Sequence, residues 1–388
     1  MTFKKNNLMY IIIGSLIVIV SISFARHAYG IILPFMKNGL SISYNSASWL
    51  GTMTSLGYLI SIVFSGHLSI KWGEKKAIIL GLLLILIGFL NLSKINGYLL
   101  NLSYMFLLGI GTAFVFTPLI SIITKWFPNN KGLVIGIMNG SSGIGLFFVG
   151  ILVPFLTNMY PEHGWRIIWM VLFLITLSVF IVTLIFLNPP PNKSKKEVNV
   201  DISKKNLYLN KKIINIGLIY GVIGYCLIVQ SLFNMSFMLE EGLAKNYAGK
   251  LISLNGILSI FSAPLWGSIS DRLGRKYTLL IAVNLVCLSV IIPILLSNAQ
   301  GFLLSLFLQG IVSIGIMTLI QAFSVEIVSS SYAPIVFSYI TFYFAIGQLI
   351  GPALSGTIIQ HFGFKSAFTL LSVLLVFCVY LTVRIPLK

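Results

Sequence analysis

The chain has 388 residues, of which 57% are apolar and only 9% are charged, and its mean hydropathy is +0.99. A soluble domain carries about 25% charged residues, so this composition excludes a soluble globular protein. The net charge of +18 would suggest a nucleic-acid partner in a soluble chain, but here the basic residues lie between apolar runs, as they do in cytoplasmic loops of membrane proteins.

Twelve apolar runs follow one another along the chain, and each is long enough to cross a bilayer as a helix. The first run is longer than the apolar part of a signal peptide, so we expect it to remain as the first helix. The sequence therefore predicts an all-α integral membrane protein with twelve transmembrane helices. They are expected at residues 10–36, 46–70, 77–95, 98–124, 132–157, 166–188, 213–239, 247–270, 277–297, 299–325, 332–360 and 364–384.

The first run contains the clearest functional candidates. Arg26 lies near its middle, with His27 beside it and Tyr29 close by. A charge at the centre of a bilayer costs about 2.5–3.5 kcal/mol, so such a residue is a functional candidate by default. Arg26 either faces a central cavity and binds a carboxylate or other oxyanion, or caps nearby carbonyls for structural reasons. His27 is either its hydrogen-bonding partner or a proton carrier, since histidine changes charge near neutral pH.

Polar side chains in the later runs supply the remaining candidates for substrate contact, although each could instead hold helices together. No Asp or Glu lies in the middle of a run, which argues against a cationic substrate. The cysteines show no metal-ligand spacing, and we predict no metal site and no cofactor. Besides Arg26, His27 and Tyr29, the predicted substrate-binding residues are Asn139, Gln230, Asn234, Asn255, Tyr343 and Gln348.

A polar, lysine-rich stretch divides the chain into two halves. It opens with three prolines and is expected to be a flexible linker at residues 189–212, between six-helix bundles at 1–188 and 213–388. With the termini placed in the cytoplasm, 19 basic residues fall on that side and six on the other. The positive-inside rule therefore predicts that both termini are cytoplasmic.

The two halves also resemble each other. Gly66 and Gly267 are 201 residues apart, as are Gly109 and Gly310. A repeat at this period indicates two parallel bundles with a solute pathway between them.

The loop after the eighth run reads Gly267-Ser-Ile-Ser-Asp271-Arg272-Leu-Gly274-Arg275-Lys276. This segment resembles the cytoplasmic G-x-x-x-D-R-x-G-R-K signature of the major facilitator superfamily, a family of transporters built from two six-helix bundles. The resemblance implies that these residues form a gate on the cytoplasmic side, whereas the bland alternative is a charged turn that obeys the positive-inside rule. The gate residues that it implies are Gly66, Lys71, Gly73, Glu74, Gly267, Asp271, Arg272, Gly274, Arg275 and Lys276.

The copy of this signature after the second run is degenerate. Ile70 stands where the family has Asp, and Glu74 is a candidate substitute for the missing acid. Met105 stands where the fourth helix of the family often has Arg, so the resemblance carries no proton-relay role to that position.

Several short segments further resemble prokaryotic carriers of the monocarboxylate and oxalate/formate type. That branch often places basic substrate ligands in its eighth and eleventh helices, and this sequence has no charge inside either. The segments are Phe24–Gly30 with Leu33-Pro34, Ala47-Ser48-Trp49, Lys125–Pro128 with Lys131-Gly132, and Gly164-Trp165-Arg166.

We therefore expect a secondary carrier in the plasma membrane of a prokaryote, with a small organic anion as its substrate and no enzymatic activity. One chain holds both bundles, so a monomer within the lipid bilayer suffices, and a proton as coupling ion is left open. The alternatives are an exporter of apolar drug-like or lipid-like compounds and a membrane sensor that does not transport.

Overall fold

The computed structural model describes residues 5–128, 130–188, 210–326 and 333–384, and all the regular structure in these ranges is helical. In chain order the helices are α1 Lys5–Val18, η1 Ile19–His27, α2 Ala28–Gly39, α3 Tyr44–Trp72, α4 Glu74–Leu92, α5 Tyr98–Trp126, α6 Lys131–Met159, α7 Gly164–Phe186, α9 Lys211–Glu240, α10 Lys245–Leu273, α11 Arg275–Leu295, α12 Ala299–Glu326 and α13 Ala333–Arg384.

The number of membrane spans agrees with the sequence. In the described ranges, ten helices are long and apolar enough to cross a membrane, and the first of them joins α1, η1 and α2. The last of the ten, within α13, contains Gly363 at φ 80° and ψ 172°, which divides it into two helices. Together with the 29-residue α3, which packs against α5 and α13, this gives the twelve predicted spans.

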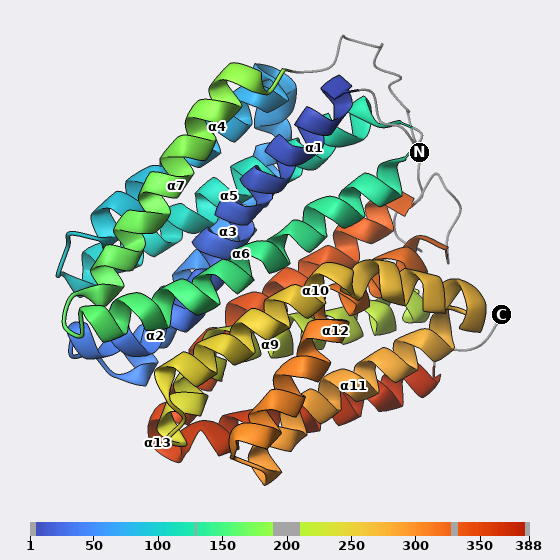
Figure 1. The fold of residues 1–388 in the computed structure, drawn as a ribbon. Coiled ribbons are helices and arrows are strands. Elements are labelled where there is room, and N and C mark those ends of the chain that lie inside the picture. The colour runs from blue at the N-terminus through green and yellow to red at the C-terminus, as the bar shows by residue number, and fades with distance from the viewer. Residues whose placement is uncertain (1–4, 129, 189–209, 327–332, 385–388) are drawn as a thin grey trace.

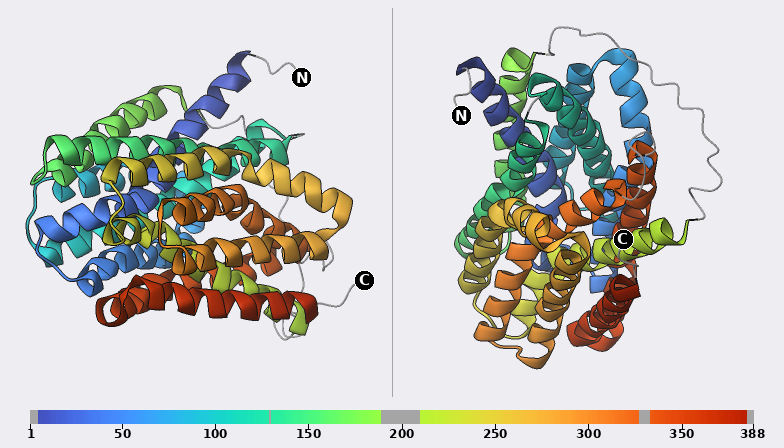
Figure 2. Two further views of the ribbon diagram at one scale, coloured as in Figure 1. Left: turned by 60° about the horizontal axis from the view of Figure 1, so that its bottom comes forward. Right: turned by 90° about the vertical axis from the view of Figure 1, so that its right-hand side faces the viewer.

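The helices form two bundles, one of α1 to α7 and one of α9 to α13, which lie side by side in Figure 1. The start of α1 and the end of α13 lie at the same end of the molecule, as Figure 2 also shows. We call this end the terminal end. The predicted linker, 189–212, lies outside the described residues except for its last three positions, 210–212, where Asn210 caps the start of α9.

We call the opposite end the closed end, because the two bundles approach each other most closely there. Here a Cβ atom on Gly356 would lie 2.0 Å from Ser48 Oγ, and one on Gly30 would lie 2.1 Å from the carbonyl oxygen of Ser231. A Cβ on Gly150 would lie 2.9 Å from the carbonyl oxygen of Gly249. The backbones of α2 and α9 and of α6 and α10 therefore approach each other closely, and the backbone of α13 approaches the Ser48 side chain of α3.

The contacts between the bundles differ between the two ends of the molecule. Near the closed end, the backbone amide of Tyr44 donates to Gln360 over 2.9 Å, and Asn158 donates to Asn246 over 2.8 Å. Toward the terminal end, a Cβ on Gly66, Gly136 or Gly267 would meet nothing within 4 Å. The bundles thus touch closely at the closed end, whereas these three glycines near the terminal end face open space.

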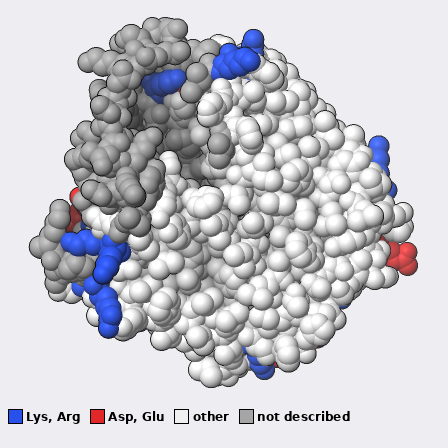
Figure 3. Space-filling view, turned by 180° about the vertical axis from the view of Figure 1, so that it is seen from behind, with Lys and Arg blue, Asp and Glu red and all other residues white. Residues whose placement is uncertain are grey.

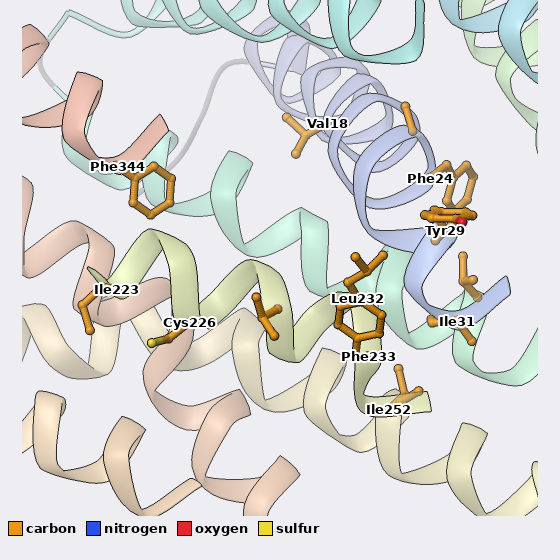
Figure 4. Close-up of a cluster of buried hydrophobic side chains, with 14 of the residues drawn as sticks. Val18, Phe24, Tyr29, Ile31, Ile223, Cys226, Leu232, Phe233, Ile252 and Phe344 are labelled. Carbon is orange, nitrogen blue, oxygen red and sulfur yellow. The ribbon is translucent and has the colours of Figure 1, made fainter. Parts of the chain in front are cut away.

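Aliphatic and aromatic side chains hold each bundle together and continue across the interface. Figure 4 shows Leu232 and Phe233 of α9 near Tyr29 and Ile31 of α2, and all four are buried. The outer surface is apolar as well. On the face shown in Figure 3, charged side chains gather toward the margins and the middle is free of them, as expected for a surface in contact with lipid.

Candidate functional site

The first membrane helix is interrupted at its middle by a π-helix, and the two basic residues Arg26 and His27 lie at the end of this π-helix. Residues 19–27 form η1, where the amide of Ala28 bonds to the carbonyl of Ser23, five residues back. Such wider turns are rare and frequently mark functional sites. The Thr112 hydroxyl donates to the carbonyl of Ser21 over 3.0 Å, and the Ser23 hydroxyl donates to the carbonyl of Ser142 over 2.6 Å. Bonds to α5 and α6 therefore stabilise the irregular segment.

Arg26 lies at the end of η1 and contacts both bundles. Its Nη2 atom donates to Gln348 Oε1 of α13 over 2.6 Å, and its guanidinium carbon lies 4.2 Å from the ring centre of Tyr58 on α3. None of the four ion pairs formed by the described residues includes Arg26. A half-buried cation is therefore held by a neutral amide and an aromatic ring, with no carboxylate to balance its charge.

A small cavity adjoins this cation. It is lined from both bundles, by Arg26, His27 and Tyr29 on one side and by Ser231 and Pro352 on the other. Its volume of about 10 Å³ is about the least that holds a single water molecule. An organic solute would therefore enter this site only if the surrounding helices moved apart.

His27 and Tyr29 differ in their surroundings. His27 is half-buried beside the cavity, and among the described residues it has no hydrogen-bonding partner. Tyr29 is buried, and its hydroxyl donates to the carbonyl of Ala47 over 2.7 Å. His27 thus has a side chain available to a solute, whereas Tyr29 also ties α2 to α3.

Asn139 lies on the side of α6 that faces the space between the bundles. Gly143 packs against α10, Gly145 packs against η1, and Ile144 is exposed on the opposite side. Helical geometry places Asn139 between the first two directions and away from the third. Its half-buried amide makes no hydrogen bond to the described residues, so it is available to a ligand.

The remaining predicted contacts lie within the C-terminal bundle. Asn234 donates to Gln309 over 2.9 Å, and Asn255 donates to the carbonyl of Leu306 over 3.0 Å. Gln230 is fully buried and donates to Ser289 over 3.2 Å. These three amides join α9, α10, α11 and α12 to one another, whereas Arg26 and Gln348 meet between the bundles.

Tyr343 is half-buried on α13, where its hydroxyl lies 3.0 Å from that of Tyr339. A Cβ on Gly217 would lie 2.9 Å from its ring, so Tyr343 packs against α9 within the same bundle.

The predicted gate of the second half forms a network at the terminal end. Gly274 has φ 84°, a left-handed conformation that favours glycine, and it separates α10 from α11. Arg275 bonds to both carboxylate oxygens of Glu326 over 2.8–3.1 Å and lies 3.2 Å from Asp271. Lys276 donates to the carbonyl of Val383 over 2.8 Å. The network therefore joins α11 to the ends of α10, α12 and α13.

The first half has an ion pair at the equivalent positions with the charges exchanged. Glu74 accepts bonds from Lys125 and Ser121, where the second half has Arg275 with Glu326. Glu74 and Arg275 are 201 residues apart, and so are Lys125 and Glu326. Gly73, at φ 92°, makes the same turn as Gly274. The degenerate copy thus keeps the geometry of the turn and an ion pair of inverted sign.

The other gate residues make fewer contacts. Lys71, Gly267, Arg272 and Asp271 lie at the ends of α3 and α10, where Asp271 is 70% exposed in its pair with Arg275. A Cβ on Gly66 or Gly267 would meet open space. The bonds described above for Glu74, Arg275 and Lys276 each stay within their own half of the chain.

Three important partners were missing from the sequence-based candidates: Tyr58 beside Arg26, Lys125 beside Glu74, and Glu326 beside Arg275. The 201-residue repeat would have pointed to the last two, because both end the fourth helix of their own half.

Comparison with known proteins agrees with this architecture. The family model described as Major Facilitator Superfamily matches residues 15–249 and 228–388. The multidrug resistance protein MdtG of Rahnella sp. is 24% identical over 379 residues, which cover 90% of this chain and 88% of that protein. The agnestins efflux protein AgnL12 of Paecilomyces divaricatus is 23% identical over 366 residues, covering 91% of this chain and 81% of that protein.

Among solved structures, a bacterial homologue of the human lysosomal transporter Spinster, in an inward-facing and unoccupied conformation, superimposes with a TM-score of 0.82. It is 14% identical, and the match covers 98% of this chain and 97% of that one. At this identity the likeness concerns the fold.

Proposed function

The chain belongs to the major facilitator superfamily, and from this premise we propose that it transports a small organic anion by alternating access. Its membership makes it a multi-pass membrane transporter of a small molecule rather than an enzyme. The family model and the fold both span two bundles in one chain, so a monomer contains the whole pathway. The substrate class is the part that we infer from the site.

The observation that carries this inference is the charge balance at Arg26. Its contacts are the neutral amide of Gln348 and the ring of Tyr58. A cation that is half-buried without an opposite charge is costly, although less so than a fully buried one, and a ligand that supplies the charge lowers this cost. The planar guanidinium also suits two-point binding of a carboxylate. An organic anion whose carboxylate replaces Gln348 beside Arg26 satisfies both conditions.

We further propose that the termini lie in the cytoplasm of a prokaryotic cell. Lys75, Lys125, Arg275 and Lys276 all lie at the terminal end, in keeping with the excess of basic residues expected on the cytoplasmic side. The closed end is then extracellular, and the conformation described here is inward-facing. His27, beside the cavity, is our candidate for any coupled proton.

A second candidate function is export of an apolar compound, with Arg26 in a structural role. The names of the relatives favour it, since MdtG is a multidrug resistance protein and AgnL12 an efflux protein. The two functions differ in whether the substrate must carry a negative charge.

Uptake into proteoliposomes distinguishes the two. We expect the wild type to take up labelled lactate or oxalate, and Arg26→Ala to lower kcat/KM at least about tenfold, the equivalent of about 1.4 kcal/mol. Lys250→Ala, at an exposed position on α10, is the matched control and should keep wild-type flux. Runs at two imposed pH gradients report proton coupling.

Equal carboxylate flux in the wild type and Arg26→Ala would contradict the anion assignment. Transport of an uncharged apolar dye, unaffected by Arg26→Ala, would establish the second candidate in its place.

A further inference from the structure

A second and larger cavity lies at the closed end, where the two bundles meet. Its volume is about 610 Å³, within the range of sites for small organic ligands. Phe35 at the end of α2 and Arg166 at the start of α7 line it from one bundle, and Leu239 and Lys245 line it from the other. It shares no lining residue with the cavity beside Arg26.

The charges in this cavity favour an anion. The Arg166 guanidinium carbon lies 4.2 Å from the ring centre of Trp165, and Lys245 Nζ lies 5.4 Å from that of Phe35. The Arg166 side chain also bonds to Asn96 and to the carbonyl of Ile95, which leaves further N–H donors free, since a guanidinium carries five. Two cations face a single carboxylate, that of Glu162.

The walls between these charges are partly apolar. Phe35 and Leu239 are half-buried, and Trp165 is 2% exposed with its indole against Gly39. A ligand with one acid group and an apolar ring would place the acid between Arg166 and Lys245 and the ring against Phe35 and Leu239.

We propose that this cavity is a regulatory site for a soluble amphipathic anion, and that the bound anion holds the closed end shut. Phe35 and Arg166 belong to one bundle and Lys245 to the other, so the site is complete only while the two bundles touch at this end. A ligand that binds one conformation shifts the equilibrium toward it. Such an anion therefore slows transport without competing with the substrate at Arg26. The proposal rests on alternating access and is independent of the substrate class proposed above.

Binding is tested with 2-naphthalenesulfonate as the probe, by isothermal titration of the full-length chain in detergent micelles. We expect Lys245→Gln to weaken binding by about tenfold, and Glu162→Gln to strengthen it by about threefold, because each changes one charge beside the ligand. Lys250→Gln is the matched control, since Lys250 is exposed on the same helix outside the cavity and should leave the affinity unchanged.

The site is separated from the central one by Arg26→Ala, which we expect to bind the probe like the wild type. Loss of binding in this variant would place the probe at the centre of the membrane and overturn the proposal. No binding to the wild type, or equal affinities in Lys245→Gln and Lys250→Gln, would also overturn it.

The effect on conformation is read from a cysteine introduced at Asn45, between the bundles at the closed end. The native cysteines Cys226, Cys287 and Cys378 are buried, so a membrane-impermeant maleimide reports the new one. We expect 2-naphthalenesulfonate to slow maleimide labelling of Asn45→Cys about tenfold. It should have no such effect on the variant that carries both Asn45→Cys and Lys245→Gln. A labelling rate that the probe leaves unchanged would contradict the regulatory role.

Discussion

Arg26 bonds to a neutral acceptor on the opposite bundle. The Gln348 oxygen 2.6 Å from its Nη2 atom carries only a partial charge, and the ring of Tyr58 contributes a cation–π interaction of about 0.5–2 kcal/mol. Both are weaker than an ion pair with a carboxylate at the same half-buried position. The amide of Gln348 thus keeps the guanidinium oriented across the interface, and in the proposed function a substrate carboxylate would replace it.

Replacing that amide by a permanent carboxylate gives the first prediction. In Gln348→Glu the side chain keeps its length, but its negative charge pairs with Arg26 and competes with the substrate. We expect KM for a transported carboxylate to rise by about tenfold or more, since charged hydrogen bonds contribute about 1.5–3 kcal/mol. Initial rates of uptake into proteoliposomes over a range of substrate concentrations measure it.

Gln360→Glu is the control for this change. Gln360 lies at the closed end and accepts a bond from the amide of Tyr44, which a carboxylate can equally accept. If both glutamate variants raised KM alike, the effect would come from added negative charge in general and not from the partner of Arg26.

The sequence identified Arg26 because a charge in the middle of an apolar run is conspicuous. It also selected Gln348, but it could not distinguish Gln348 from Gln230, which bonds inside its own bundle. In membrane helices the lipid-facing and the buried sides are both apolar, so hydrophobic periodicity does not show which way a polar residue faces. Tyr58 went unnoticed for the same reason, since nothing marks one tyrosine within an apolar helix.

At the scale of the elements, the prediction of the helices was good and that of their irregularities was not. Length and hydropathy specify a membrane span, so the twelve runs were found. Gly363 was correctly placed in the break between the last two of them, where its φ of 80° divides α13. The π-helix at residues 19–27 depends on bonds from Thr112 and Ser23 to distant backbone carbonyls, and these bonds leave no local pattern in the sequence.

The inverted ion pairs at the terminal end give the second prediction. The Glu74 side chain is 13% exposed and that of Lys125 is 54% exposed, so the pair is only partly screened by water. In Glu74→Lys two like charges meet, whereas Glu74→Lys combined with Lys125→Glu restores a pair with the sign found in the second half. We expect the single variant to lower the free energy of unfolding by about 1–2 kcal/mol and the double variant to recover most of it.

Thermal unfolding of the single and double variants in detergent measures this coupling. Lys75→Glu is the matched control, because Lys75 donates to the carbonyl of Leu184 and has no ion-pair partner among the described residues. A double variant no more stable than Glu74→Lys alone would show that the reversed pair at positions 74 and 125 stabilises nothing.

For the whole molecule, the glycines show where the two bundles come close to each other. The close approaches of Gly356 to α3 and of Gly30 to α9 all lie at the closed end, while Gly66 and Gly267 near the terminal end face open space. If the molecule alternates as we propose, the closed-end contacts must part in the other conformation. A larger side chain at the closed end then destabilises only the conformation in which the bundles touch at that end.

Gly356→Ala should therefore shift the equilibrium rather than simply weaken the fold. The new Cβ would lie 2.2 Å from Ser48 Cβ, an atom that no change of rotamer can move away. Overpacking costs about 1–3 kcal/mol. If this cost falls on one of two conformations, it changes the equilibrium constant between them by a factor of about 5–150.

Labelling of Asn45→Cys by an impermeant maleimide should thus become faster by a factor in that range when Gly356→Ala is added. Gly97→Ala in the same background should not change the rate, because Gly97 is exposed at φ −78° and its Cβ would meet only Leu100, at 3.7 Å or more. An unchanged rate in the Gly356 variant, with the protein still folded, would mean that the contact between α3 and α13 does not control access to this end.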